Sequence, residues 1–151
     1  MRWWWYLTPF GWIQAYLSAS ILVHEVGHLV AAKLTGHRVV GLKVGRADPA
    51  YAFSFRDVLF EFSGDAMGGR VRVDMSVPVT QTAILVTALA GPLANVVSAM
   101  ILLLMAAATA RCGLPAGIRM WMVSALALVA LAEATHGLSS IPREIRNILK
   151  K

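Results

Sequence analysis

Three long apolar segments and one polar region between the first two dominate the hydropathy pattern of the 151-residue chain. The first segment predicts a helix over residues 7–34, and the second predicts a helix over residues 80–110, a stretch without acidic or basic residues. The third is shorter and covers residues 119–137. Because about 20 predominantly apolar residues suffice to cross a bilayer, the pattern predicts three transmembrane helices.

The polar region, residues 36–79, has the pattern of β structure. Runs at residues 37–44 and 51–62 are rich in valine and aromatic residues, and polar and apolar residues alternate over residues 70–73. An open sheet edge cannot face lipid, so this region must lie at the membrane surface or be covered by protein. We hypothesise that an extended substrate adds to such an edge as a further strand.

The composition supports a membrane protein with a single domain, residues 1–151. Hydrophobic residues make up 58% of the chain and charged residues only 15%, which is far from the balance of soluble globular domains. The net charge of +6 is spread over loops and the C-terminal tail without interleaved aromatic residues, so no nucleic-acid partner is expected. Cys112 is the single cysteine, which excludes an internal disulfide and a cysteine-rich metal site.

Basic residues predict the orientation in the membrane. With three spans, the polar region and the basic tail at residues 143–151 lie on one side and carry ten Lys and Arg, against three on the other side. The positive-inside rule then places the β region and the C-terminus in the cytoplasm and the N-terminus outside. The expected location is the plasma (inner) membrane of a prokaryote. Tryptophans and a tyrosine at residues 3–6 have the composition of an aromatic belt. The alternative, a signal peptide cleaved near residues 18–20, would leave His24 close to a new terminus.

The first apolar segment contains the sequence HEVGH at residues 24–28. On a helix, this pattern places two imidazoles one turn apart on one face, where they can bind one zinc ion with the glutamate beside them as general base. The alternative is a set of polar side chains in an ordinary core. Ionisable groups within a membrane span are costly and usually mark function, which favours the metal site.

The second apolar segment is interrupted by Gly91-Pro92, where we expect a break in the helix. Asn95 then projects an amide with both a donor and an acceptor into the bilayer. The alternative is a kinked helix whose asparagine pairs with a neighbouring helix.

Three features in this order resemble the site-2 protease family of intramembrane zinc metalloproteases. They are HEVGH at residues 24–28, Gly-Gly-Arg-Val at residues 68–71, which is similar to the family's Gly-Gly-Tyr-Val segment, and Ala-Gly-Pro-Leu-Ala-Asn at residues 90–95. The resemblance covers about residues 17–104. It implies an α-helical integral membrane protein with a core of three transmembrane helices and a small membrane-associated β region between helices 1 and 2.

The resemblance also implies roles for individual residues. His24 and His28 are expected to bind Zn²⁺, Glu25 to activate the bound water, and Asn95 to hold the substrate backbone or the developing oxyanion. The implied activity is zinc-dependent cleavage of a transmembrane segment of a membrane-anchored regulatory protein. The alternatives are a catalytically inactive homologue that binds a metal or a helix, and a small proton or metal transporter subunit. The sequence does not indicate an oligomeric state.

The chain departs from the family at the third metal ligand. A catalytic zinc site normally has three protein ligands, and the family takes its third from an Asp-Gly motif after the third core helix. Residues 139–142 resemble the turn that precedes this motif, but no Asp-Gly follows them. Three explanations stay open: a chain truncated before the aspartate, a catalytically inactive protein, or a substitute ligand such as Glu144, Glu133 or His136.

Overall fold

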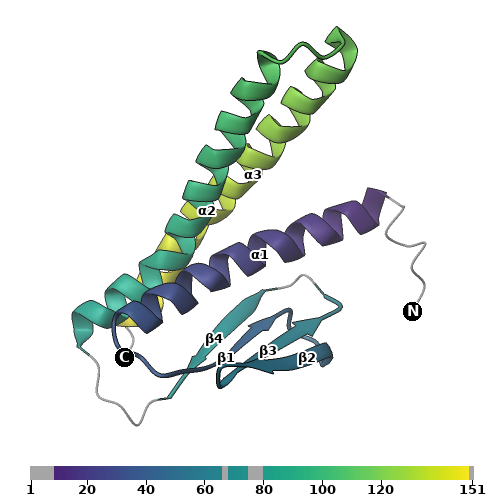
Figure 1. The fold of residues 1–151 in the computed structure, drawn as a ribbon. Helices are drawn as coiled ribbons and strands as arrows, with labels where there is room; N and C mark the ends of the chain where they lie inside the picture. The colour runs from purple at the N-terminus through teal and green to yellow at the C-terminus, as the bar shows by residue number, and fades with distance from the viewer. Residues whose placement is uncertain (1–8, 66–67, 75–79, 150–151) are drawn as a thin grey trace.

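The computed structural model describes residues 9–65, 68–74 and 80–149. The predicted aromatic belt at residues 3–6 lies outside these ranges. The elements in chain order are α1 (Pro9–Leu34), β1 (Val39–Val44), β2 (Pro49–Phe55), β3 (Val58–Ser63), β4 (Gly69–Val73), α2 (Gln81–Ala110) and α3 (Ala116–Leu149). Helices α2 and α3 lie side by side, α1 crosses them, and the sheet lies along the side of α1 that faces away from them (Figure 1).

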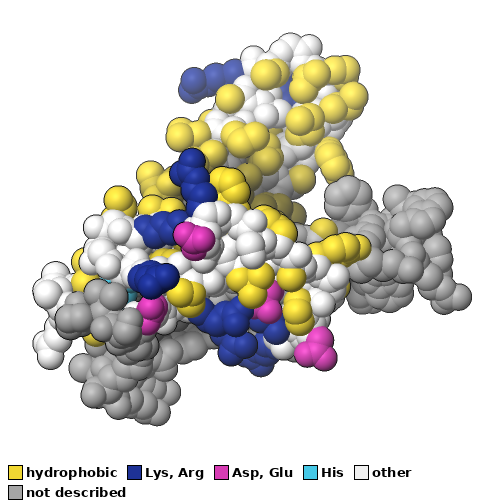
Figure 2. All heavy atoms as spheres, turned by 60° about the horizontal axis from the view of Figure 1, so that its bottom comes forward, with side chains coloured by type: hydrophobic (Ala, Val, Ile, Leu, Met, Phe, Trp, Pro, Cys, Tyr) yellow, Lys and Arg dark blue, Asp and Glu magenta, His cyan; other side chains and the backbone are white. Residues whose placement is uncertain are grey.

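The predicted set of three apolar helices with a small sheet after the first is confirmed. Within the described residues, Gln14–Leu34, Gln81–Ala110 and Ala116–Pro142 are long and apolar enough to cross a membrane. Figure 2 shows hydrophobic side chains covering the arm formed by α2 and α3, whereas Lys and Arg gather over the sheet. An apolar surface of this extent fits lipid better than water.

Two helices differ from the prediction in their extent. Helix α3 continues to Leu149 and includes Pro142, although the sequence predicted an end at residue 137 and a separate basic tail. In the turn before Pro142, the hydroxyls of Ser139 and Ser140 donate to the carbonyl oxygens of His136 and Gly137. The carbonyl that loses its helical partner to the proline is that of Leu138. Helix α2 likewise runs unbroken through Gly91-Pro92, where we expected a break.

The sheet has four strands in the order β2-β3-β1-β4. Strand β1 is parallel to β3 and antiparallel to β4, and β2 is antiparallel to β3. The single strand predicted over residues 51–62 is wrong, because a tight turn at Arg56 and Asp57 divides it into β2 and β3. Both turn residues have positive φ angles, 46° and 66°.

One face of the sheet packs on α1. Leu42 and Val44 of β1 form a core cluster with Ile21, and Val39 and Val58 form a second with Ala32. On its other side α1 meets α2 at Gly27, where a Cβ would lie 2.5 Å from the carbonyl oxygen of Ala90. Since only glycine permits this approach, Gly27 fixes the crossing point of the two helices inside the HEVGH sequence.

Candidate metal centre

Helix α1 buries the first two residues of HEVGH between α2 and the sheet, whereas Val26 is exposed. His24 is 7% exposed and Glu25 6% exposed. The rings of His24 and His28 lie one helical turn apart, with their centroids separated by 4.8 Å and their planes at 82°. The structure therefore brings the two predicted ligands together on one face of the helix.

Both histidines direct a ring nitrogen at Gly91 of α2. A Cβ on this residue would lie 2.4 Å from Nε2 of His28 and 2.8 Å from Nε2 of His24. The two Nε2 atoms therefore lie against one point of the α2 backbone, in room that exists because residue 91 has no side chain. Two converging imidazole nitrogens are a donor set that suits zinc, so these residues fit the ion that the sequence predicted.

A hydrogen bond fixes the protonation of His28. Its Nδ1 lies 2.7 Å from the carbonyl oxygen of Thr87. A carbonyl oxygen can only accept, so Nδ1 carries a proton, and in the neutral ring Nε2 then keeps its lone pair. Histidines that bind metals commonly donate their other ring N–H in this way, and the proton therefore leaves Nε2 of His28 available to a metal.

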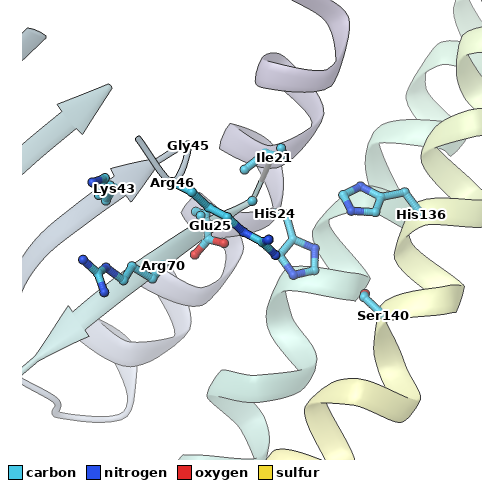
Figure 3. A pocket seen from close by; sticks show the side chains of 11 residues that line it. Ile21, His24, Glu25, Lys43, Gly45, Arg46, Arg70, His136 and Ser140 are labelled. Atoms are coloured by element: carbon cyan, nitrogen blue, oxygen red, sulfur yellow. The ribbon is translucent and has the colours of Figure 1, made fainter. Parts of the chain in front are cut away.

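Glu25 lies on the side of α1 that faces the sheet. Its side chain packs on the first residue of β4, so that a Cβ on Gly69 would lie 2.8 Å from Oε1 of Glu25. Glu25 and His24 open onto one cavity of about 340 Å³ between α1, the sheet and α3 (Figure 3). The family-like glycine pair at residues 68–69 thus forms part of the cavity wall and leaves room for the glutamate.

Asn95 of α2 is fully buried, with 0% exposure, and does not line this cavity. Its Nδ2 lies 2.9 Å from Nδ1 of His136, and its Oδ1 has no hydrogen-bond partner among the described residues. A role for Asn95 in substrate binding stays a prediction.

The structure adds Ser20 to the surroundings of the motif. The Ser20 hydroxyl donates to Oε2 of Glu133 at 3.1 Å and lies 3.0 Å from Nδ1 of His136. Ser20 was not among the residues predicted for the site, although its position four residues before His24 places it on the same face of α1. That spacing is the signal that would have found it.

Arg46, in the turn after β1, is a second lining residue that the sequence analysis missed. Its side chain extends in the direction of His24 in Figure 3. Asp65 holds the turn, because its carboxylate accepts the backbone N–H groups of Ala47 at 2.9 Å and Arg46 at 3.0 Å. These two bonds keep the pKa of Asp65 below its ordinary value.

The substitute ligands occupy different places. His136 lines the cavity, and its ring stacks on that of His24 with the centroids 5.6 Å apart. Glu133 is buried next to Ser20 and does not line the cavity, and the side chain of Glu144 lies outside the described part of the chain. Among the described residues, no three His, Cys, Asp or Glu side chains already form a group that could hold a metal ion.

Comparison with known proteins supports the resemblance found in the sequence. The profile of Peptidase family M50 matches residues 12–150, which include all three helices and the whole sheet apart from the first residues of α1. Comparison with curated proteins gives no match. The family is one of intramembrane metalloproteases, and its profile covers most of the chain. The chain therefore belongs to Peptidase family M50, the site-2 protease family.

Proposed function

We propose that this chain is a zinc-dependent protease that hydrolyses a peptide bond in a transmembrane segment of a membrane-anchored regulatory protein. The observation that carries the proposal is the convergence of His24 and His28 on Gly91, with Glu25 on the adjoining cavity. Family membership supports the reaction class.

In this proposal His24 and His28 hold the zinc ion through their Nε2 atoms. A bound zinc ion supplies Lewis acidity, which makes hydroxide available near neutral pH. Glu25 takes the proton of the attacking water on its carboxylate and passes it to the leaving amine. The buried position of Glu25, 6% exposed, keeps this proton away from bulk solvent. Asn95 stays a candidate for holding the substrate backbone or the developing oxyanion.

The sheet offers a place for the substrate backbone. Strand β4 is an edge strand of the sheet, and its first residue, Gly69, packs on Glu25. Peptide bonds in a helix are shielded by their own hydrogen bonds, so a transmembrane substrate must unwind before cleavage. A segment that adds to β4 would be extended and would lie beside Glu25. The proposed setting is a prokaryotic plasma membrane with the sheet on the cytoplasmic side.

Glu25→Gln tests the proposal in proteoliposomes that contain a model transmembrane substrate. Because the general base is lost and the metal ligands remain, we expect cleavage to fall by about 100- to 10,000-fold with unchanged zinc content. The matched control is Asp57→Asn, which neutralises an exposed carboxylate in the turn between β2 and β3. Asparagine tolerates the positive φ of that position, so cleavage should stay at the wild-type rate.

Other outcomes would favour the alternatives. Cleavage unaffected by Glu25→Gln would show that the protease mechanism is wrong. Zinc binding by the wild-type chain without cleavage of any transmembrane substrate would favour an inactive, metal-binding homologue. Ion or proton flux across the liposome membrane in the absence of substrate would favour a transporter subunit.

A further inference from the structure

A chain of buried polar side chains links α1 to α3 beside the metal centre. Ser20 of α1 is 2% exposed and Glu133 of α3 is 3% exposed. The hydroxyl of Ser20 lies within hydrogen-bond distance of both Glu133 and His136. Burial of a carboxylate is costly unless it accepts hydrogen bonds. Each donor in this set of side chains must therefore face an acceptor.

The Ser20 hydroxyl donates its hydrogen bond to Oε2 of Glu133. The Ser20 oxygen is then free to accept, and the atom 3.0 Å away is Nδ1 of His136. Nδ1 therefore carries a proton, and Nε2 of His136 keeps its lone pair. This is the tautomer that the Thr87 carbonyl imposes on His28.

Asn95 is compatible with the same assignment. Turning its amide by half a rotation exchanges Nδ2 and Oδ1 and places the oxygen 2.9 Å from Nδ1 of His136. The buried Oδ1, which otherwise has no partner among the described residues, then accepts a hydrogen bond from the imidazole N–H. Ser20 and Asn95 both present an acceptor to the protonated nitrogen of His136.

The position of His136 fits an ion shared with His24. Two imidazoles on a tetrahedral zinc with Zn–N distances of about 2.0–2.1 Å have ring centroids about 5 Å apart. The His24 ring lies 4.8 Å from that of His28 and 5.6 Å from that of His136. Figure 3 shows His136 on α3 turned toward His24, and both line the same cavity. A network that served only to join the helices would not require this imidazole to line the cavity.

We propose that His136 is the third protein ligand of the zinc site, and that Ser20 and Glu133 are its positioning residues. This inference rests on the proposed zinc site. In this assignment, His136 replaces the third metal ligand that the family takes from its Asp-Gly motif. Glu133 is excluded as the ligand because it accepts from Ser20 and lies off the cavity.

Metal binding to the purified full chain tests the assignment, with Zn²⁺ affinity and the absorption spectrum of bound Co²⁺ as readouts. His136→Gln keeps an amide that can bond to Ser20 and Asn95 but removes the imidazole. We expect its Zn²⁺ affinity to fall by more than about 100-fold, since changes to supporting residues alone cost about 10- to 100-fold. Glu133→Gln should weaken Zn²⁺ binding by about 10-fold. Both variants should alter the Co²⁺ spectrum.

The matched control is Thr135→Ala, which changes an exposed side chain whose hydroxyl donates to the carbonyl oxygen of Ala132 within α3. This variant should bind Zn²⁺ as the wild type does. Wild-type Zn²⁺ affinity in both His136→Gln and Glu133→Gln would overturn the assignment. If His136→Gln failed to fold, wild-type Zn²⁺ affinity in Glu133→Gln alone would overturn it.

His24→Ala separates this inference from the proposed function. Loss of Zn²⁺ in His24→Ala but not in His136→Gln refutes this inference alone, whereas a wild-type chain that binds no Zn²⁺ refutes the proposed function.

Discussion

Gly91 sets the space in which the two motif histidines meet. Its missing side chain matters more than its backbone freedom, because a Cβ would lie 2.4 Å from Nε2 of His28 and 2.8 Å from Nε2 of His24. Contacts this short require the imidazoles to move. The α2 backbone would therefore form part of the proposed metal centre without supplying a ligand.

Gly91→Ala should remove zinc binding while leaving a folded chain. Overpacking of this kind costs about 1–3 kcal/mol of stability, and here the strain falls on the ligand nitrogens. The measurement is zinc content together with thermal unfolding. Gly117→Ala is the matched control, since a Cβ at that helical position meets nothing within 4 Å and alanine favours a helix. Wild-type zinc content in Gly91→Ala would contradict the convergence described for His24 and His28.

At the residue scale, the sequence predicts side-chain positions best where the spacing of a motif along a helix determines which face its residues share. HEVGH predicted a shared helix face for His24 and His28, and the structure confirms that arrangement. Ser20 escaped notice because a serine in an apolar helix has many ordinary uses. Its partners on α3 lie more than 110 residues away, so its role depends on a tertiary contact that no local pattern encodes.

Among the elements, the turn after β1 is held by one carboxylate. Asp65 accepts backbone N–H groups from Ala47 and Arg46, and its pKa is lower in the folded chain than its ordinary value of 3.8. A depressed carboxyl pKa contributes stability that is present above the unfolded pKa and is lost as the pH falls through the folded value. Acidification should therefore loosen the turn that carries Arg46.

Amide resonances of Arg46 and Ala47 provide the measurement. We expect them to shift as the pH falls below about 3.8, whereas Asp65→Asn should show no such transition. Asp57→Asn removes an exposed carboxylate in the turn between β2 and β3, and it should leave the transition in place. A transition that persisted in Asp65→Asn would mean that another group holds the turn.

The helices and strands were predictable where composition changes abruptly. The start of α2 was one such place, because Thr80 caps the helix and its side chain accepts from the N–H of Ala83. The turn at Arg56 and Asp57 was not predictable, because Arg56 is not a residue that favours a positive φ angle, although Asp57 is. The predicted third helix ended too early, at Gly137, whereas α3 continues through Pro142 to Leu149.

For the whole molecule, the membrane orientation is the prediction to test. Cys112 is exposed in the short connection between α2 and α3, on the opposite side of the proposed membrane from the sheet. A membrane-impermeant maleimide should label Cys112 in intact cells. A variant that combines Cys112→Ser with Asp57→Cys should be labelled only after the membrane is permeabilised. The reverse pattern would invert the topology.

Two glycines join the three helices on either side of Gly91. Gly27 of α1 approaches the carbonyl of Ala90, and on α3 a Cβ at Gly137 would lie 2.8 Å from the carbonyl of Pro92. Both crossings thus lie within one residue of the point where the histidine nitrogens converge. A rod that pivots near its support moves least there and most at its ends. Any rotation of the helices about these crossings would therefore displace His24 and His28 less than residues at the helix ends.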